Sequence, residues 1–302
     1  MTGMSPRAIF ATDLAKGWRP WGIFVPVLGL IFVAMTVASF TALLQHARLV
    51  DAAENPIGLQ GFAAFLLLPF AALGLAVLAW VRFVERRSLS TLGLVNRGRL
   101  QTFLLGHMTG VAMATAIVAA IWIAGSFAAR GYAPAFHSPA GLAGIVILLA
   151  CFAVQSSVEE ILFRGWMLSA IATKFGTVPA IAISSAAFTL MHYDPGVSAI
   201  FVTNVFLFAV FACCWAIAVG NIWGVMGFHS GWNWLLATGF ELRVTGLDAH
   251  LPALLVKLVP RGPDYLTGGV QGPEGSVLCS VVLLGGIVFL GLRRQRERRA
   301  RG

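Results

Sequence analysis

The chain has 302 residues, of which 58% are hydrophobic and only 11% are charged, and its formal net charge is +9. About a quarter of the residues in an ordinary soluble domain are charged, so this composition excludes a soluble globular protein. The apolar residues form long runs and not the short alternating segments of a membrane β-barrel. The sequence therefore predicts an all-α polytopic membrane protein.

Eight apolar segments are candidate membrane spans, since a spanning helix needs about 20 apolar residues. The expected spans are approximately residues 22–45, 57–81, 102–127, 141–166, 178–193, 198–219, 222–240 and 276–292. The first segment has no small-residue cleavage site, so we expect a retained span and not a signal peptide. Residues 241–275 are expected to lie outside the membrane as an interfacial helix followed by a Pro/Gly-rich loop.

The distribution of basic residues predicts the orientation, because cytoplasmic loops are enriched in Lys and Arg. If the N-terminus is inside, sixteen of the 21 basic residues fall in inside segments. The five that remain outside are Arg48, Arg130, Arg243, Lys257 and Arg261. We therefore expect a multi-pass protein of the cell membrane with both termini in the cytoplasm.

The C-terminal sequence "RRQRERRARG" is expected to contact membrane lipids through their anionic headgroups. It has no interleaved aromatic residues and no folded soluble domain beside it, so nucleic acid is not an expected partner. The four cysteines all lie within expected spans and none forms a CxxC pair, which argues against a zinc ribbon or a disulfide framework.

Two adjacent carboxylates, Glu159 and Glu160, lie within the fourth expected span in the stretch "SSVEEILFRGW". A charge at the bilayer centre costs at least about 2.5–3.5 kcal/mol, so such residues are candidates for function. Glu160 and Arg164 are one helical turn apart and can form a structural ion pair. Glu159 then projects about 100° around the helix from Glu160, without an evident partner in the sequence.

The spans that follow contain further polar residues. In "FTLMH", His192 lies near the end of the fifth span, one turn after Phe188. In "HSGWN", His229 and Asn233 lie one turn apart on one face of the seventh span. A single histidine in an apolar helix is more often a hydrogen-bonding residue between helices than a catalytic group. If the three spans converged on one cavity, however, they would supply a complete hydrolytic site.

These residue types suit amide hydrolysis by water. A carboxylate in a low-dielectric pocket is a stronger base than one in water and can activate the nucleophile. A neighbouring histidine can share the proton and later deliver it to the leaving amine. An Asn amide and an imidazole N–H can stabilise the oxyanion, each such donor typically contributing about 2.7–4 kcal/mol. No serine or cysteine nucleophile is required.

The motifs "EEILFR", "FTLMH" and "HSGWN", in this order on consecutive apolar segments, resemble the CAAX-protease and bacteriocin-processing (CPBP, Abi) family of intramembrane glutamate endopeptidases. The basic segment "ERRSLSTLGLV", from Glu85 to Val95, is similar to the one that precedes the family's core. The resemblance divides the chain into residues 1–84 with the first two helices, a catalytic core at 85–240, and residues 241–302 with the external loop, last helix and basic tail.

The resemblance implies about eight transmembrane helices around a conical intramembrane cavity, and cleavage of a membrane-proximal protein or peptide. The implied roles are activation of water by Glu159 with His192 assisting, and oxyanion stabilisation by His229 and Asn233. Glu160, Arg164 and Phe188 would organise the helix face and position the substrate.

Metal dependence is left open by the sequence. Glu159, His192 and His229 could together ligate Zn²⁺ with water as the fourth ligand, although no HExxH motif is present. A metal-independent mechanism without a cofactor is favoured.

The alternating topology raises a question of depth. It puts Glu159 toward the inner half of the fourth span and His192 at the far end of the fifth. The two residues match in depth only if the fifth span is displaced or tilted, or if residues 164–174 continue the fourth helix beyond the membrane.

Two other functions remain open. One is a non-catalytic scaffold or bacteriocin-immunity-type protein of the same fold, since fold does not determine activity. The other is a proton-coupled transporter in which Glu159 and the histidines form a relay. Catalysis is favoured because all four candidate catalytic positions hold competent residues, and the internal repeats of many transporters are absent.

Overall fold

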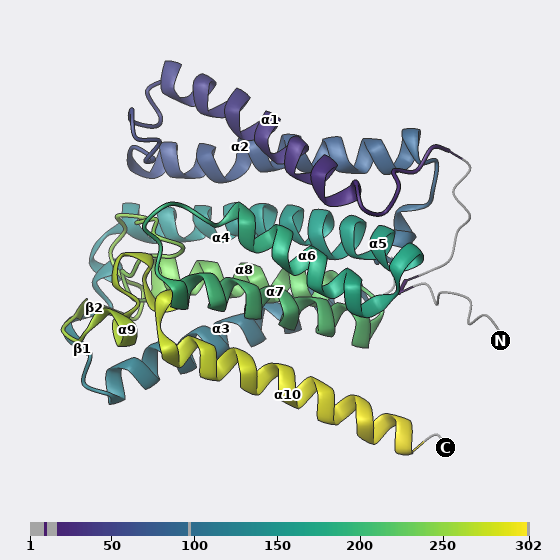
Figure 1. The fold of residues 1–302 in the computed structure, drawn as a ribbon. Coiled ribbons are helices and arrows are strands. Elements are labelled where there is room, and N and C mark those ends of the chain that lie inside the picture. Colours follow the sequence, from purple (N-terminus) through teal and green to yellow (C-terminus); the bar gives the residue numbers. More distant parts are fainter. Residues whose placement is uncertain (1–8, 11–16, 96–97, 301–302) are drawn as a thin grey trace.

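A computed structural model describes residues 9–10, 17–95 and 98–300 (Figure 1). The long helices are α1 (Val25–His46), α2 (Gly58–Ala79), α3 (Arg99–Ile123), α4 (Pro139–Glu160), α7 (Ala199–Val219) and α10 (Val277–Arg299). Shorter helices are α5 (Leu168–Phe175), α6 (Thr177–Met191), α8 (Trp223–Gly239) and α9 (Asp264–Thr267). The predicted class, an all-α polytopic membrane protein, is confirmed.

Six helical segments within the described residues are long and apolar enough to cross a membrane. The expected spans at 178–193 and 222–240 form the shorter helices α6 and α8, of 15 and 17 residues. Nearly every residue of α8 is buried in the protein, so this helix lies among other helices and does not need the length of a lipid-facing span. The count of eight spans is therefore not confirmed.

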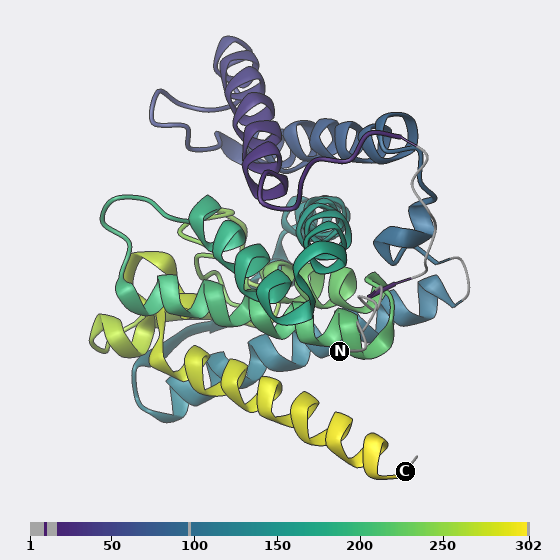
Figure 2. The same cartoon turned by 45° about the vertical axis from the view of Figure 1, so that its right-hand side comes forward.

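The helices form layers that run roughly along one axis. In Figure 1, α1 and α2 lie on one side, α4 to α8 form the middle, and α3 and α10 lie on the opposite side. Figure 2 shows α10 along the outer edge of the bundle from a second direction. In the most apolar 18-residue stretch of α1 and of α10, only 11% of the residues are buried in the protein, as expected for helices whose surface faces lipid.

Small residues bring α3 and α8 into close backbone contact. Gly106 and Gly110 of α3 are spaced as GxxxG, and so are Gly227 and Gly231 of α8. A Cβ atom at any of the four would collide with a backbone carbonyl of the other helix. Such pairs let membrane helices approach closely. His229 lies two residues from both α8 glycines and so projects about 200° from them, away from α3.

Helix α4 continues through a π-helical turn, Ile161–Met167, into α5, giving one helical segment of 37 residues from Pro139 to Phe175. At about 1.5 Å per residue, about 24 Å of helix separates Glu159 from Phe175, and the return through α6 to His192 covers about 22 Å. The depths of Glu159 and His192 therefore match because residues 164–174 extend the fourth helix, which is one of the routes expected from the sequence.

A buried carboxylate fixes this extended helix to the end of α2. Glu85 follows the π-helical turn Trp80–Val84 and is 1% exposed. Its Oε1 accepts hydrogen bonds from Nε1 of Trp80 at 3.1 Å and of Trp166 at 2.6 Å. Its Oε2 pairs with Nε of Arg87 at 2.6 Å. We call Glu85, Trp80, Trp166 and Arg87 the Glu85 clamp.

The segment expected to form an interfacial helix folds differently. Residues Val256–Pro260 form strand β2, which pairs antiparallel with β1 (Phe127–Tyr132). The third expected span accordingly ends as helix at Ile123, before β1 begins. The expectation of an interfacial helix was wrong because the apolar residues around Val256 are buried by strand pairing instead. Short 3-10 turns complete the described structure at Leu89–Leu92, Pro134–His137, Gly269–Gln271 and Pro273–Gly275.

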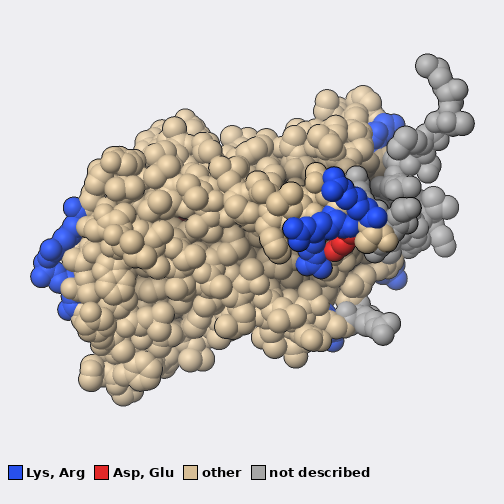
Figure 3. All heavy atoms as spheres, turned by 90° about the horizontal axis from the view of Figure 1, so that it is seen from below, with Lys and Arg blue, Asp and Glu red and all other residues tan. Residues whose placement is uncertain are grey.

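Charged side chains of the described residues are absent from the middle of one face of the protein surface (Figure 3). On the face shown in Figure 3, Lys and Arg gather toward the two ends and a wide band between them carries neither sign of charge. A bilayer core excludes charges in this way. The chain is therefore a multi-pass membrane protein whose helices cross the apolar band.

Candidate active site

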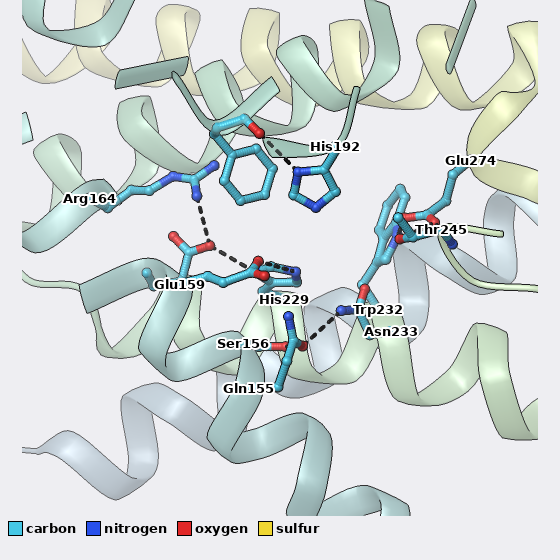
Figure 4. A network of polar contacts seen from close by, with 12 residues as sticks. Gln155, Ser156, Glu159, Arg164, His192, His229, Trp232, Asn233, Thr245 and Glu274 are labelled. Atoms are coloured by element: carbon cyan, nitrogen blue, oxygen red, sulfur yellow. Dashed lines mark hydrogen bonds and ion pairs between the residues drawn. The ribbon is translucent and has the colours of Figure 1, made fainter. Parts of the chain in front are cut away.

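The candidate residues surround a cavity of about 240 Å³ inside the bundle. Most of its wall is apolar and comes from α1, α2, α4, α6, α7 and α8. The polar side chains predicted from the sequence that reach this wall are those of Glu159, His192, His229 and Asn233. Figure 4 shows these four facing a common space. The structure thus brings together all four residues expected to be catalytic.

Glu160 forms the centre of a buried polar network. Its Oε1 atom accepts a hydrogen bond from Nη1 of Arg164 at 3.1 Å, and Nδ1 of His229 lies 2.9 Å from the same oxygen. The side chains of Glu160 and Arg164 are both 0% exposed. The ion pair expected from the i, i+4 spacing is therefore present, and its carboxylate also orients His229.

The carboxylate of Glu159 has fewer polar contacts than that of Glu160. Its Oε2 atom is buried and has no hydrogen-bond partner among the described residues. Nε2 of His229 lies 3.7 Å from that oxygen, which is beyond hydrogen-bond distance. A buried carboxylate oxygen without a donor is costly, so Glu159 is the group in this cavity that a water or a substrate N–H would satisfy.

Phe188 separates Arg164 from the cavity. The Cζ atom of Arg164 lies 4.2 Å from the centre of the Phe188 ring, in cation–π contact. Phe188 also lines the cavity and stacks against His192, with ring centres 4.5 Å apart. Neither Glu160 nor Arg164 is among the described residues that line the cavity wall. Their position suits the expected structural role, and Phe188 is the member of this group that a substrate would touch.

The protonation of His192 follows from its position at the end of α6. Its Nδ1 atom lies 2.9 Å from the carbonyl oxygen of Phe188, one turn earlier. A carbonyl only accepts, so Nδ1 carries the proton and Nε2 keeps its lone pair in the neutral ring. His192 is half-buried. It therefore presents a basic nitrogen at the cavity.

Gln155 is a site residue that the sequence interpretation missed. Its Oε1 atom accepts hydrogen bonds from Nδ2 of Asn233 at 3.2 Å and from Oγ of Ser156 at 3.0 Å. It lies one turn before Glu159 on α4, and its side chain is buried. A polar residue four positions before the carboxylate in an apolar helix was a signal that could have identified it.

Glu274 closes the cavity from the segment that follows α8, and it was also missed. Its Oε1 atom accepts a hydrogen bond from Nε1 of Trp232 at 2.9 Å, while Oε2 accepts from the backbone N–H and the hydroxyl of Thr245. Asn204 of α7 donates to the Glu274 carbonyl at 2.7 Å. These bonds fasten the segment after α8 over the site. No local pattern marks Glu274, because its partners are distant in sequence.

The charges of the buried network do not balance. Glu159 and Glu160 carry two negative charges against the one positive charge of Arg164, which leaves a net charge of −1 with neutral histidines. Buried charge without compensation is strongly unfavourable.

The arrangement does not match the zinc set that the sequence permits. Within the described part of the chain, no three His, Cys, Asp or Glu side chains are grouped so that they could hold a metal ion.

Residues 139–235 match the family model described as type II CAAX prenyl endopeptidase Rce1-like. This segment is similar to that family of CAAX prenyl endopeptidases. It contains all three motifs, from Glu159 on α4 to Asn233 on α8, but not helices α1 and α2, which also line the cavity. The matched segment contains Trp166 of the Glu85 clamp, but not Glu85, Trp80, Arg87 or Glu274. A search of curated proteins and a search of solved structures each gave no match.

Proposed function

We propose that the protein is an intramembrane endopeptidase in which water activated by Glu159 hydrolyses a peptide bond. The observation that carries this proposal is the open Oε2 atom of Glu159, buried at a cavity wall and 3.7 Å from Nε2 of His229. The match of residues 139–235 to a CAAX prenyl endopeptidase family supports the same class of reaction.

The first step is attack by water on the scissile carbonyl. Glu159 takes a proton from the water molecule while the water oxygen forms a bond to the carbonyl carbon. The imidazole of His192 faces the same space and shares that proton through its unprotonated Nε2 atom. The carbonyl π electrons move onto oxygen, so a tetrahedral oxyanion forms without a covalent enzyme intermediate.

His229 and Asn233 stabilise the oxyanion. With Nδ1 donating to Glu160, His229 offers an Nε2–H donor to the oxyanion in its doubly protonated form. Asn233 uses one amide hydrogen for Gln155 and retains the second for the oxyanion. In the last step the oxyanion re-forms the carbonyl, the C–N bond breaks, and the proton held by Glu159 and His192 passes to the leaving amine.

The substrate in this proposal is a membrane-proximal protein or peptide. The predominantly apolar wall of the cavity favours an apolar stretch of chain around the cleaved bond. The orientation we propose has both termini in the cytoplasm, because the basic residues that precede α1, follow α2 and end α10 lie at one end of the bundle (Figure 1). The mechanism requires no metal.

The test uses purified protein in proteoliposomes mixed with membranes from cells that lack it, followed by mass spectrometry of new peptide termini. Glu159→Ala, His192→Ala and His229→Ala should each abolish the new termini while the protein still inserts. Asn233→Ala should slow their formation by roughly 10²–10³-fold if its amide donates to the oxyanion. Full activity in Glu159→Ala would overturn the mechanism.

A further inference from the structure

A second cavity lies away from the candidate active site, at the end of the bundle where α1 begins and α5 ends. It has a volume of about 380 Å³. Its charged lining residues are Arg19, Glu85, Arg87 and Lys174. Three positive charges thus face one negative charge, and the single carboxylate is already engaged in the Glu85 clamp. Among the described residues that line the cavity, positive charges therefore outnumber negative charges by two.

Arg87 has an unused donor at this cavity. Its side chain is 6% exposed, with Nε on Glu85 and Nη1 donating to Thr91 at 3.2 Å and Ser169 at 3.3 Å. Its Nη2 atom is buried and has no hydrogen-bond partner among the described residues. A buried guanidinium N–H without an acceptor is costly, so this atom indicates an acceptor that the protein does not itself supply.

The positive charges also act on one another. Burial lowers the pKa of Arg87, Glu85 raises it, and the charge of Arg19 lowers it again. Arg19 and Arg87 are thus close enough to repel each other even with the Glu85 carboxylate beside them. An anion placed between the two guanidinium groups would reverse this repulsion.

The wall of the cavity is built by close backbone packing. The N–H of Gly17 donates to the carbonyl of Glu85 at 3.1 Å. Five residues later, a Cβ atom on Gly22 would lie 2.8 Å from the Phe175 ring and 3.2 Å from Cβ of Lys174. Residues 17–22 therefore bridge from the clamp to the end of α5, which gives the cavity a defined shape.

The aromatic residues beside the cavity indicate its depth in the membrane. Trp18 and Trp21 are 62% and 55% exposed, and Phe24 at the start of α1 is 58% exposed. Trp residues concentrate at the level of the lipid headgroups. The cavity thus opens where the apolar surface of α1 ends, at the level where a phosphate group of the bilayer lies.

We propose that this cavity binds the phosphate group of an anionic phospholipid, with Arg87, Arg19 and Lys174 as its donors. Planar guanidinium groups suit phosphate oxygens, and Nη2 of Arg87 would receive its missing acceptor. Basic pockets between membrane helices are known to hold anionic headgroups. The acyl chains would lie along the exposed apolar side of α1. This site shares no residue with the candidate active site.

The test is native mass spectrometry of the delipidated full-length protein titrated with dioleoylphosphatidylglycerol or dioleoylphosphatidylcholine. The wild type should bind phosphatidylglycerol more tightly than phosphatidylcholine. The variant Arg19→Gln/Lys174→Gln changes two exposed residues and should weaken phosphatidylglycerol binding about tenfold or more. The matched control Arg82→Gln/Arg86→Gln removes the same charge from exposed positions outside the cavity and should change binding less than about twofold.

Three outcomes would overturn the proposal. Equal weakening in both double variants would show general attraction to a basic surface and not a site. Equal affinity of the wild type for the two lipids would remove the anionic headgroup as the ligand. Complete displacement of phosphatidylglycerol by excess inorganic phosphate would assign the cavity to free phosphate instead of lipid. Glu159→Gln should bind the lipid as the wild type does, so this result is independent of proteolysis.

Discussion

The Glu85 clamp makes a prediction about stability that can be worked out from its contacts. The substitution Glu85→Gln keeps the side-chain volume and removes the charge. Arg87, which is 6% exposed, then loses the carboxylate that lies 2.6 Å from its Nε atom. Removing one partner of a buried ion pair costs about 3–5 kcal/mol. The indole of Trp166 also exchanges a charged acceptor at 2.6 Å for a neutral one. We expect the free energy of unfolding to fall by at least about 3 kcal/mol.

The assay is reversible unfolding in detergent micelles, followed by circular dichroism. The matched control is Glu241→Gln, which removes the carboxylate that pairs with Lys257. The Lys257 side chain is 45% exposed and the Glu241 side chain is 26% exposed. A partly exposed pair contributes about 0–1 kcal/mol, so this variant should remain close to the wild type. Equal free energies of unfolding for the two variants would refute the view that the buried clamp holds α5 and the end of α2 together.

Three further predictions concern the site and its support. Gln155→Met removes the acceptor that orients Asn233 and should slow the formation of Glu159-dependent termini about tenfold. In the double variant with Asn233→Ala, it should cause no further slowing. Additive effects of the two substitutions would contradict this role. Gly227→Val places a branched side chain against a backbone carbonyl of α3 and should lower the free energy of unfolding by about 1–3 kcal/mol. The control Gly131→Val, where a Cβ atom meets nothing within 4 Å, should not do so. Millimolar 1,10-phenanthroline should leave the formation of the termini unchanged, whereas reversible loss restored by zinc would establish a metal enzyme.

Local patterns in the sequence predicted the parts of the structure that depend on local physics. Apolar runs of sufficient length located the helices, because burial in lipid requires them. The pairing of Glu160 with Arg164 followed from helical spacing. The approach of His229 to Glu160 could only be assumed, since 69 residues separate them and their contact depends on how α8 packs against α4.

Some elements of the structure could have been found in the sequence and were not. The two GxxxG patterns, beginning at Gly106 and Gly227, were readable and explain how α8 is fixed against α3. Gln155 was visible as a polar residue one turn before Glu159. Glu274 gave no such signal, because its role depends on Trp232 and Thr245, which the fold brings to it.

The main error concerned the segment after α8. We expected residues 241–275 to contain an interfacial helix, but the apolar residues around Val256 do not form one. They instead pair with residues around Ala129 in a strand that follows α3. A short apolar run does not by itself distinguish a helix from a strand, and the partner strand lies more than a hundred positions earlier in the sequence. Tertiary pairing decided the outcome.

The central claim is that Glu159 activates water for peptide hydrolysis. The most direct measurement compares protein termini in cells that carry the wild type, Glu159→Gln or the exposed control Glu54→Gln, at matched membrane levels. The proposal predicts termini that appear with the wild type and with Glu54→Gln and are absent with Glu159→Gln. Identical termini in all three, with Glu159→Gln restoring any phenotype of deletion, would contradict proteolysis and indicate a non-catalytic scaffold.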